Sequence, residues 1–168
     1  MGESELIVDF RSEAQLVDFA GALARRWQAA SLYPLLIGLR GDLGSGKTTW
    51  VRALLNGLGY QGRVPSPTYT LLEHYPLPAL EVVHLDLYRL AAEEELENLG
   101  LRDWLAQPAC WVLVEWPERA ARLAKCCDLL LDFEFAGDGG RRVTLTCATE
   151  AGAIALRHGH DPKFNYEG

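Results

Sequence analysis

The sequence predicts an α/β fold in three layers, with a mixed central sheet between helices, from three observations. An apolar run, Leu35 to Leu39, is followed at once by a glycine-rich segment and then by residues at helical spacing, which is the order strand, loop, helix. A second run, Ala109 to Val114, is almost continuously apolar, as in a strand that is buried on both faces. Hairpin-like strand pairs within residues 70–87 and 129–147 add antiparallel strands to this sheet.

Length and charge limit the class of protein. With 168 residues, 49% of them hydrophobic, the chain is long enough for one well-buried core and short for two. We expect one domain over residues 1–157 and a polar, mobile tail over residues 158–168. The 16 basic and 23 acidic residues give a net charge of −7, which argues against a general electrostatic grip on nucleic acid. Without a secretion signal or an apolar run of about 18 residues, we expect a cytoplasmic protein that does not span a membrane.

The first elements are a strand over residues 6–10 and an amphipathic helix that extends to about Ala30. Ser12 has the position of a helix N-cap, with Gln15 at the capping-box position. Apolar residues then recur at helical spacing: Leu16, Phe19, Ala20, Leu23 and Trp27. The pair Arg25 and Arg26 is expected on the solvated face of this helix.

The segment from Gly41 to Thr48 fits the phosphate-binding pattern G-x-x-x-x-G-K-[ST], the P-loop, and stands between the predicted strand and a helix over residues 49–58. Its glycines allow positive φ, so that backbone N–H groups face an oligophosphate. Lys47 would reach the β- and γ-phosphates, and the Thr48 hydroxyl would bind magnesium. A glycine-rich turn that binds nothing would not require a lysine and a hydroxyl residue at fixed offsets. The fold is therefore expected to be P-loop NTPase-like.

Shorter elements follow. Two prolines exclude a helix from residues 63–70, which should be a loop. The expected strands are residues 70–75, 81–87, 129–135 and 142–147, besides the apolar run already described. The expected helices are residues 93–100, 103–106 and 118–125, and one that begins at Thr149.

Two carboxylates at strand ends are candidates to complete a magnesium shell. Glu115 ends the most apolar strand, and Asp86 ends another; ligands bind at this edge of an α/β sheet, and magnesium prefers carboxylate oxygens. Either residue could instead be a surface carboxylate. We favour Glu115 as metal ligand or water-orienting group, and the role of Asp86 stays open.

Polar residues precede and follow Asp86. His84, Asp86 and Tyr88 share one face of their strand, because side chains alternate. Such a face either borders a site or faces solvent, and a lone histidine is more often structural than catalytic. Arg89 could neutralise charge that develops on a γ-phosphate, or it could pair with the glutamates that follow it.

The segment Ser66, Pro67, Thr68 and Tyr69 follows the P-loop helix, where switch loops of nucleotide hydrolases sense the γ-phosphate. The alternative is a connector that its prolines stiffen. The sequence has no N-K-x-D motif for guanine, so adenine is favoured by elimination.

Together, four motifs across residues 5–148 resemble the TsaE (YjeE) family in order and spacing. They are GDLGSGKTT at 41–49, SPTY at 66–69, HLDLYRL at 84–90 and VEWPE at 114–118. The resemblance implies a bacterial P-loop ATPase that is needed to form N6-threonylcarbamoyladenosine at position 37 of ANN-decoding tRNAs. It implies that the protein binds the TsaB–TsaD pair, reaches tRNA only through that complex, and resets the complex by hydrolysing ATP.

The resemblance also implies roles for individual residues, with ATP and Mg2+ as cofactors. Lys47 would bind phosphate, Thr48 and Glu115 would hold magnesium, and Asp86 would be important for catalysis. The segment 66–69 would be a switch element. Other residues expected at the nucleotide are Glu13, Gly44, Ser45, Gly46, Thr49, Trp116 and Glu118. Ser45 stands where the family usually has alanine, a small change that should still admit phosphate.

Two other functions stay open. A small-molecule kinase shares the P-loop but needs an acceptor pocket and usually an arginine-bearing lid; the one arginine-dense turn, Arg141 and Arg142, lies in a short hairpin. In a non-hydrolytic module, ATP would only order a docking surface. Glu115 and Asp86 together favour hydrolysis, in agreement with the weak magnesium-dependent ATPase, modulated by partner proteins, that the resemblance implies.

Overall fold

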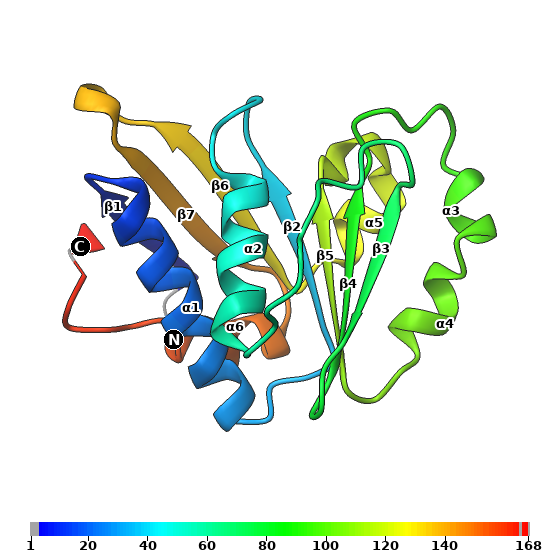
Figure 1. Cartoon of the computed structure of the whole chain (residues 1–168), viewed down its shortest axis with the longest axis horizontal. Coiled ribbons are helices and arrows are strands. Elements are labelled where there is room, and N and C mark those ends of the chain that lie inside the picture. Colours follow the sequence, from blue (N-terminus) through cyan, green and yellow to red (C-terminus); the bar gives the residue numbers. More distant parts are fainter. Residues whose placement is uncertain (1–3, 165, 168) are drawn as a thin grey trace.

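The computed structural model describes residues 4–164 and 166–167, which form one mixed sheet with helices on both faces (Figure 1). Its strands are β1 (Glu5–Phe10), β2 (Leu35–Arg40), β3 (Leu72–Pro76), β4 (Glu81–Asp86), β5 (Cys110–Glu115), β6 (Leu129–Phe135), β7 (Arg141–Cys147) and β8 (Tyr166–Glu167). Its α-helices are α1 (Glu13–Ala29), α2 (Lys47–Gly57), α3 (Glu95–Asn98), α4 (Leu101–Leu105), α5 (Ala121–Cys126) and α6 (Glu150–Arg157). Two 3-10 turns, η1 (Pro117–Arg119) and η2 (Gly137–Gly139), complete the described elements.

The sheet confirms the predicted mixed topology. Its order is β3-β4-β5-β2-β6-β7-β1-β8. The central strands β4, β5, β2 and β6 pair in parallel, whereas β3 pairs with β4, β7 with β6, and β1 with β7 in antiparallel fashion. Both predicted hairpins are therefore present. The parallel strands point their carboxyl ends to one edge, where an α/β sheet binds its ligands.

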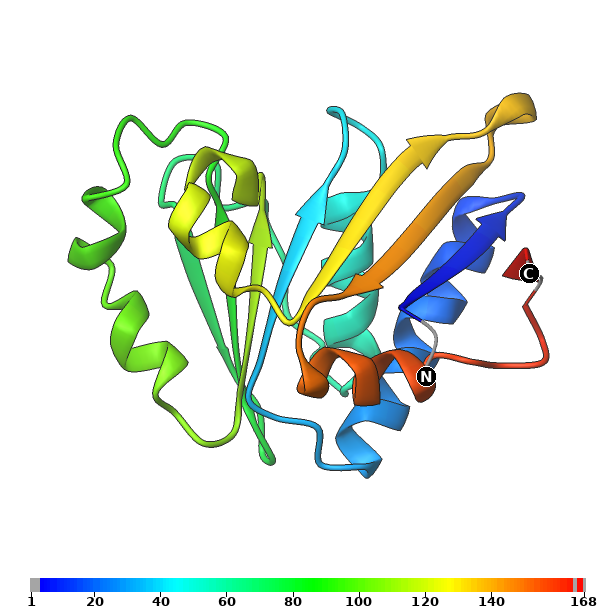
Figure 2. The same cartoon turned by 180° about the vertical axis from the view of Figure 1, so that it is seen from behind.

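Two apolar clusters lie on the two faces of the sheet and make the three layers (Figures 1 and 2). On one face, α1 and α2 bury Phe19 and Trp50 against the sheet. On the other, α3, α4 and α5 contribute Leu96, Leu101 and Leu123. Among the described residues, no helix is long and apolar enough to cross a membrane.

The predicted N-cap of α1 is confirmed. Ser12 has extended backbone, and its side chain accepts the N–H of Gln15 at 3.3 Å. The Gln15 side chain accepts the N–H of Arg11 at 2.7 Å, one residue before the usual capping-box partner. The expected helix over residues 118–125 is divided at Ala120, whose φ of −131° and ψ of 86° separate η1 from α5.

The described part of the tail that was expected to be mobile contacts the domain, whereas residues 165 and 168 lie outside the described residues. Arg26 donates to the carbonyl oxygens of His158 and Gly159 and forms an ion pair with Asp161 at 2.7 Å. The ring of Phe164 lies 4.9 Å from that of Phe19, and β8 pairs with β1. Arg26 is therefore not on a purely solvated face, because the polar segment after α6 folds back over it.

Close packing of α1 on α2 gives a first prediction. A Cβ atom at Gly57 would lie 2.6 Å from the Cα and carbonyl oxygen of Gly21, which are backbone atoms that cannot rotate away. Gly57→Ala should therefore lower the free energy of unfolding by about 1–3 kcal/mol, measured by urea denaturation. A Cβ atom at Gly21 would meet nothing closer than 3.5 Å. Gly21→Ala, the matched control, should leave stability unchanged or raise it by up to about 1 kcal/mol. Equal effects of the two substitutions would contradict this packing.

Candidate nucleotide-binding site

A cavity of about 360 Å³ lies at the carboxyl ends of β2, β4 and β5, within the size range of small-molecule sites. It brings together most of the predicted site residues. Those that line it are Gly44, Gly46, Lys47, Thr48, Thr49, Ser66, Thr68, Asp86, Glu115 and Trp116. Tyr88 and Arg89 also line it, and no glutamate forms an ion pair with Arg89 among the described residues.

Five predicted site residues do not line this cavity. Glu13 is exposed in the first turn of α1, and Pro67 lies between two lining residues. Ser45 is fully buried, and its hydroxyl has no hydrogen-bond partner in the described part of the chain. Tyr69 is 83% exposed, with the Arg89 guanidinium 4.8 Å from the centre of its ring. Glu118 is exposed in η1, and its charge acts to raise the pKa of Lys47.

The P-loop has the backbone that a phosphate cradle needs. Gly44 and Gly46 have φ of 76° and 116°, in the left-handed region that favours glycine. Gly46 is the N-cap of α2, and no side chain caps this helix end. Its first N–H groups are thus left for another acceptor. At Gly41, a Cβ atom would lie 2.6 Å from the carbonyl oxygen of Phe133, which holds the loop against β6.

Lys47 is buried, with 4% of the residue exposed, and its ammonium group lies inside the loop. Its Nζ donates to the carbonyl oxygens of Gly41 at 2.5 Å and Asp42 at 2.9 Å, and it lies 4.4 Å from the centre of the Trp116 ring. Burial lowers the pKa of Lys47, while nearby carboxylates, Glu115 foremost, act in the opposite direction. A bound phosphate would give this cation a charged partner in place of neutral carbonyls.

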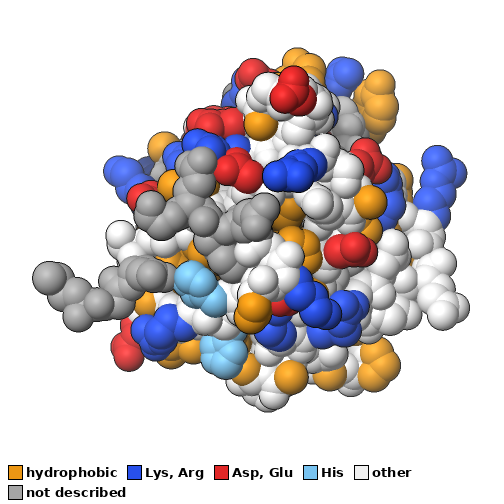
Figure 3. Space-filling model, turned by 90° about the vertical axis from the view of Figure 1, so that its left-hand side faces the viewer, with side chains coloured by type: hydrophobic (Ala, Val, Ile, Leu, Met, Phe, Trp, Pro, Cys, Tyr) orange, Lys and Arg blue, Asp and Glu red, His pale blue; other side chains and the backbone are white. Residues whose placement is uncertain are grey.

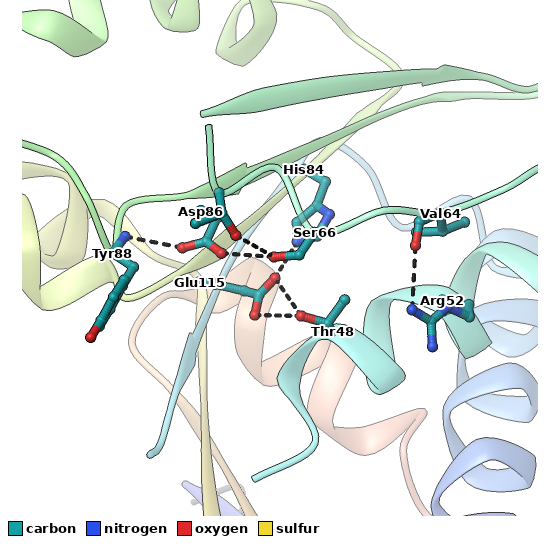
Figure 4. A network of polar contacts seen from close by, with 9 residues as sticks. Thr48, Arg52, Val64, Ser66, His84, Asp86, Tyr88 and Glu115 are labelled. Atoms are coloured by element: carbon teal, nitrogen blue, oxygen red, sulfur yellow. Dashed lines mark hydrogen bonds and ion pairs between the residues drawn. The ribbon is translucent and has the colours of Figure 1, made fainter. Parts of the chain in front are cut away.

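Glu115 connects the P-loop helix to β4 (Figure 4). The Thr48 hydroxyl lies 2.9 and 3.1 Å from the two carboxylate oxygens of Glu115. One of these oxygens is 2.6 Å from Nε2 of His84. Thr48 and Glu115, the residues predicted to share a metal ion, therefore touch directly.

His84 is a buried member of this network, although it was not among the predicted site residues. It is completely buried, contacts Glu115, and leaves Nδ1 without a partner among the described residues. Its place two residues before Asp86 was a usable signal, because both side chains face the same way. The parallel pairing of β4 with β5, which brings Glu115 to that face, was not visible in the sequence.

Asp86 connects the predicted switch segment to the cavity (Figure 4). Its Oδ2 accepts from the Ser66 hydroxyl at 2.9 Å, and its Oδ1 accepts from the N–H of Tyr88 at 3.0 Å. The Ser66 hydroxyl is also 3.1 Å from that of Thr68. The position of residues 66–68 thus depends on the same carboxylate that faces the cavity.

Trp116 shows local backbone strain beside these carboxylates. Its φ of 59° and ψ of 48° are left-handed, an uncommon backbone for a bulky residue. Its N–H donates to the carbonyl oxygen of Leu39 at 3.1 Å, and its ring lies 5.1 Å from that of Tyr88. The turn directs the Trp116 ring across Lys47 as the chain leaves β5.

Thr48 and Glu115 supply oxygen atoms, the kind of ligand that magnesium takes. In the described part of the chain, no group of three or more His, Cys, Asp or Glu residues could hold a metal ion. Thr48 and Glu115 offer a hydroxyl and a carboxylate, and magnesium is commonly held by one or two carboxylates together with substrate phosphates and water. These two residues would hold the ion.

The buried contact of His84 gives a second prediction. His84→Leu would leave the Glu115 carboxylate buried without this partner, and it should lower the free energy of unfolding by about 1–3 kcal/mol. The matched control is His74→Leu, since His74 pairs with Glu81 at the surface and its ring lies 4.4 Å from that of Trp104. A surface pair contributes about 0–1 kcal/mol, so the control should change stability less. Urea denaturation measures both effects, and a loss of stability in His74→Leu as large as that in His84→Leu would contradict a stabilising role for the contact between His84 and Glu115.

Comparison with known proteins identifies the family of the chain. Residues 10–143, which include every predicted site residue, match the model of the family described as "Threonylcarbamoyl adenosine biosynthesis protein TsaE". A Haemophilus influenzae protein named tRNA threonylcarbamoyladenosine biosynthesis protein TsaE is 42% identical over 118 residues, which cover 70% of this chain and 73% of that protein. A Borreliella burgdorferi protein of the same name is 32% identical over 139 residues, 80% of this chain and 95% of that one.

The crystal structure of Bacillus subtilis YdiB has the same fold, with a TM-score of 0.73 and 95% of each chain covered at 23% identity. That identity supports a shared fold only. The family match and the two relatives carry the assignment: this chain belongs to the TsaE family.

Proposed function

We propose that this protein is a magnesium-dependent ATPase that acts in the cytoplasm in the formation of tRNA N6-threonylcarbamoyladenosine, together with TsaB and TsaD homologues. Its relatives carry the name of that pathway. The observation that supports hydrolysis is the meeting of Lys47, Thr48, Asp86 and Glu115 in one cavity. A module that only binds nucleotide would need the lysine and the loop, but not two carboxylates beside them.

Each group has a task in this proposal. The N–H groups at the start of α2 and the Lys47 ammonium would bind the phosphates of ATP. Lys47 would exchange the carbonyl oxygens of Gly41 and Asp42 for phosphate oxygens. Thr48 and Glu115 would hold magnesium, which when bound neutralises charge on the phosphates.

Asp86 would act on the attacking water and on the switch segment. It faces the cavity while it holds Ser66, so a change at the γ-phosphate position could release or order residues 66–68. Arg89 lines the same cavity and would stabilise charge on the transferred phosphate. Because its guanidinium lies on the exposed ring of Tyr69, its position would also follow the switch.

The partners supply what this chain lacks. Its net charge is −7, and the face that carries β1 shows acidic side chains interspersed with basic ones (Figure 3). Affinity for a nucleic-acid backbone needs several Lys or Arg contacts. We therefore place tRNA on the TsaB–TsaD complex and give this chain the task of resetting that complex.

A kinase would need an arginine-bearing lid, for which the sequence offers only Arg141 and Arg142. Arg141 donates to backbone carbonyl oxygens, and Arg142 pairs with Asp9 at 2.8 Å. Both arginines are engaged within the domain, which gives no support to either as a cation that closes over an acceptor.

Phosphate release tests the function. We expect slow ATP turnover by the chain alone, altered when TsaB and TsaD are added, and reduced at least about 100-fold in Lys47→Ala and Glu115→Ala, because each removes a charge at the phosphates or the metal. Lys125→Ala, which changes an exposed lysine of α5, is the control and should retain full turnover.

Two results would count against this function. Turnover that partners leave unaltered, with no complex on gel filtration, would separate the protein from TsaB and TsaD. ATP binding without phosphate release under every partner condition would favour the non-hydrolytic module, and a phosphorylated metabolite would revive the kinase.

A further inference from the structure

Arg141, at the start of β7, reaches from the β6–β7 hairpin to the P-loop. Its Nε donates to the carbonyl oxygen of Ser45 at 3.2 Å, and its Nη2 to that of Gly44 at 3.4 Å. The P-loop and the turn of this hairpin lie at the same end of the sheet (Figures 1 and 2). One guanidinium therefore contacts two consecutive peptide units of the loop.

The same side chain is anchored on its own hairpin. Its Nη1 donates to the carbonyl oxygens of Gly139 at 3.1 Å and Gly140 at 3.0 Å, and its guanidinium lies 4.5 Å from the centre of the Phe135 ring. Among the described residues it has no acidic partner. All its acceptors are carbonyl oxygens, and the rigid planar fork of arginine suits two of them at once.

The peptide geometry connects this contact to phosphate binding. In a trans peptide, the C=O and N–H groups of one unit point in opposite directions. A Ser45 carbonyl that faces Arg141 therefore directs the N–H of Gly46, a residue that lines the cavity, away from Arg141. The N–H of Ser45 closes a turn on the carbonyl oxygen of Asp42 at 3.1 Å. Because the backbones of Gly44 and Gly46 are conformationally free, contacts with Arg141 would restrict the conformations of this part of the loop.

We propose that Arg141 is a positioning residue of the P-loop, which holds the carbonyl oxygens of Gly44 and Ser45 so that the phosphate-binding N–H groups are ordered before nucleotide arrives. This inference rests on the proposed function, because it assigns a nucleotide to the loop. Arg141 is not among the residues that line the cavity. It acts on loop order and on nucleotide affinity, since an ordered site does not have to lose that freedom on binding.

The neighbouring residue supplies a matched control. Arg142 follows directly in β7, so its side chain points to the opposite face of the sheet. Its Nε and Nη2 pair with the two carboxylate oxygens of Asp9 at 2.8 and 2.9 Å. Arg142→Ala removes an arginine of the same strand without touching the P-loop.

Two measurements on the full chain test the proposal. ADP affinity is measured by calorimetry, and amide hydrogen exchange at Ser45 and Gly46 is measured without ligand, for wild type, Arg141→Ala, Arg141→Lys and Arg142→Ala. Arg141→Ala should bind ADP about tenfold more weakly and exchange faster at both amides. Arg141→Lys keeps the charge but not the fork, and it should change both readouts in the same direction. Arg142→Ala should match wild type within about twofold in affinity.

Hydrogen exchange is the readout that tests the positioning role of Arg141. Unchanged exchange in both Arg141 variants overturns the proposal, whatever their affinity. If Arg141→Ala fails to fold, as thermal unfolding would reveal, the exchange and affinity of Arg141→Lys decide in the same way. If wild type binds no nucleotide, the proposed function fails, and the exchange rates of the unliganded variants still accept or reject the positioning role.

Discussion

The parallel register of β2, β5 and β4 places three strand ends at one level of the sheet. Leu39 pairs with Glu115, and Asp86 pairs with the same glutamate from the other side. The loop that leaves β2 therefore starts beside both carboxylates, and Thr48, one residue into α2, reaches Glu115 directly. A shift of one residue between β4 and β5 would put Asp86 and Glu115 on opposite faces of the sheet. The site thus depends on sheet pairing before it depends on any side chain.

The buried polar groups lie at the P-loop and at the neighbouring strand ends. The described residues include five buried polar or charged ones, and all belong to the P-loop, the start of α2 or the strands beside it: Ser45, Lys47, His84, Asp86 and Glu115. Buried charges are costly unless they are paired and hydrogen-bonded. Here the lysine has carbonyl oxygens, and the two carboxylates accept from hydroxyl, imidazole and backbone groups. Titratable groups gathered in this way inside a cleft mark a candidate functional site.

Local patterns predicted most of the elements, because an apolar run, an N-cap or a pair of prolines acts over a few residues. The P-loop and the acids at strand ends were visible for the same reason. Contacts between distant segments were not. His84 contacts Glu115 on a neighbouring strand. Arg26 contacts residues more than 130 positions later in the chain. Arg141 contacts the carbonyl oxygen of Ser45 in the P-loop, 96 residues before it. Periodicity contains no information about such pairings, so the tail after α6 was expected to be mobile.

We propose that Thr48 and Glu115 form the magnesium site of a nucleotide-binding loop, and the magnesium dependence of nucleotide affinity tests this directly. A non-hydrolysable ATP analogue is titrated by calorimetry with and without magnesium, into wild type and Glu115→Gln. Wild type should bind at least about tenfold more tightly with magnesium, and the variant should lose this gain because its amide carries no charge for the ion. An unchanged magnesium effect in Glu115→Gln would contradict the claim.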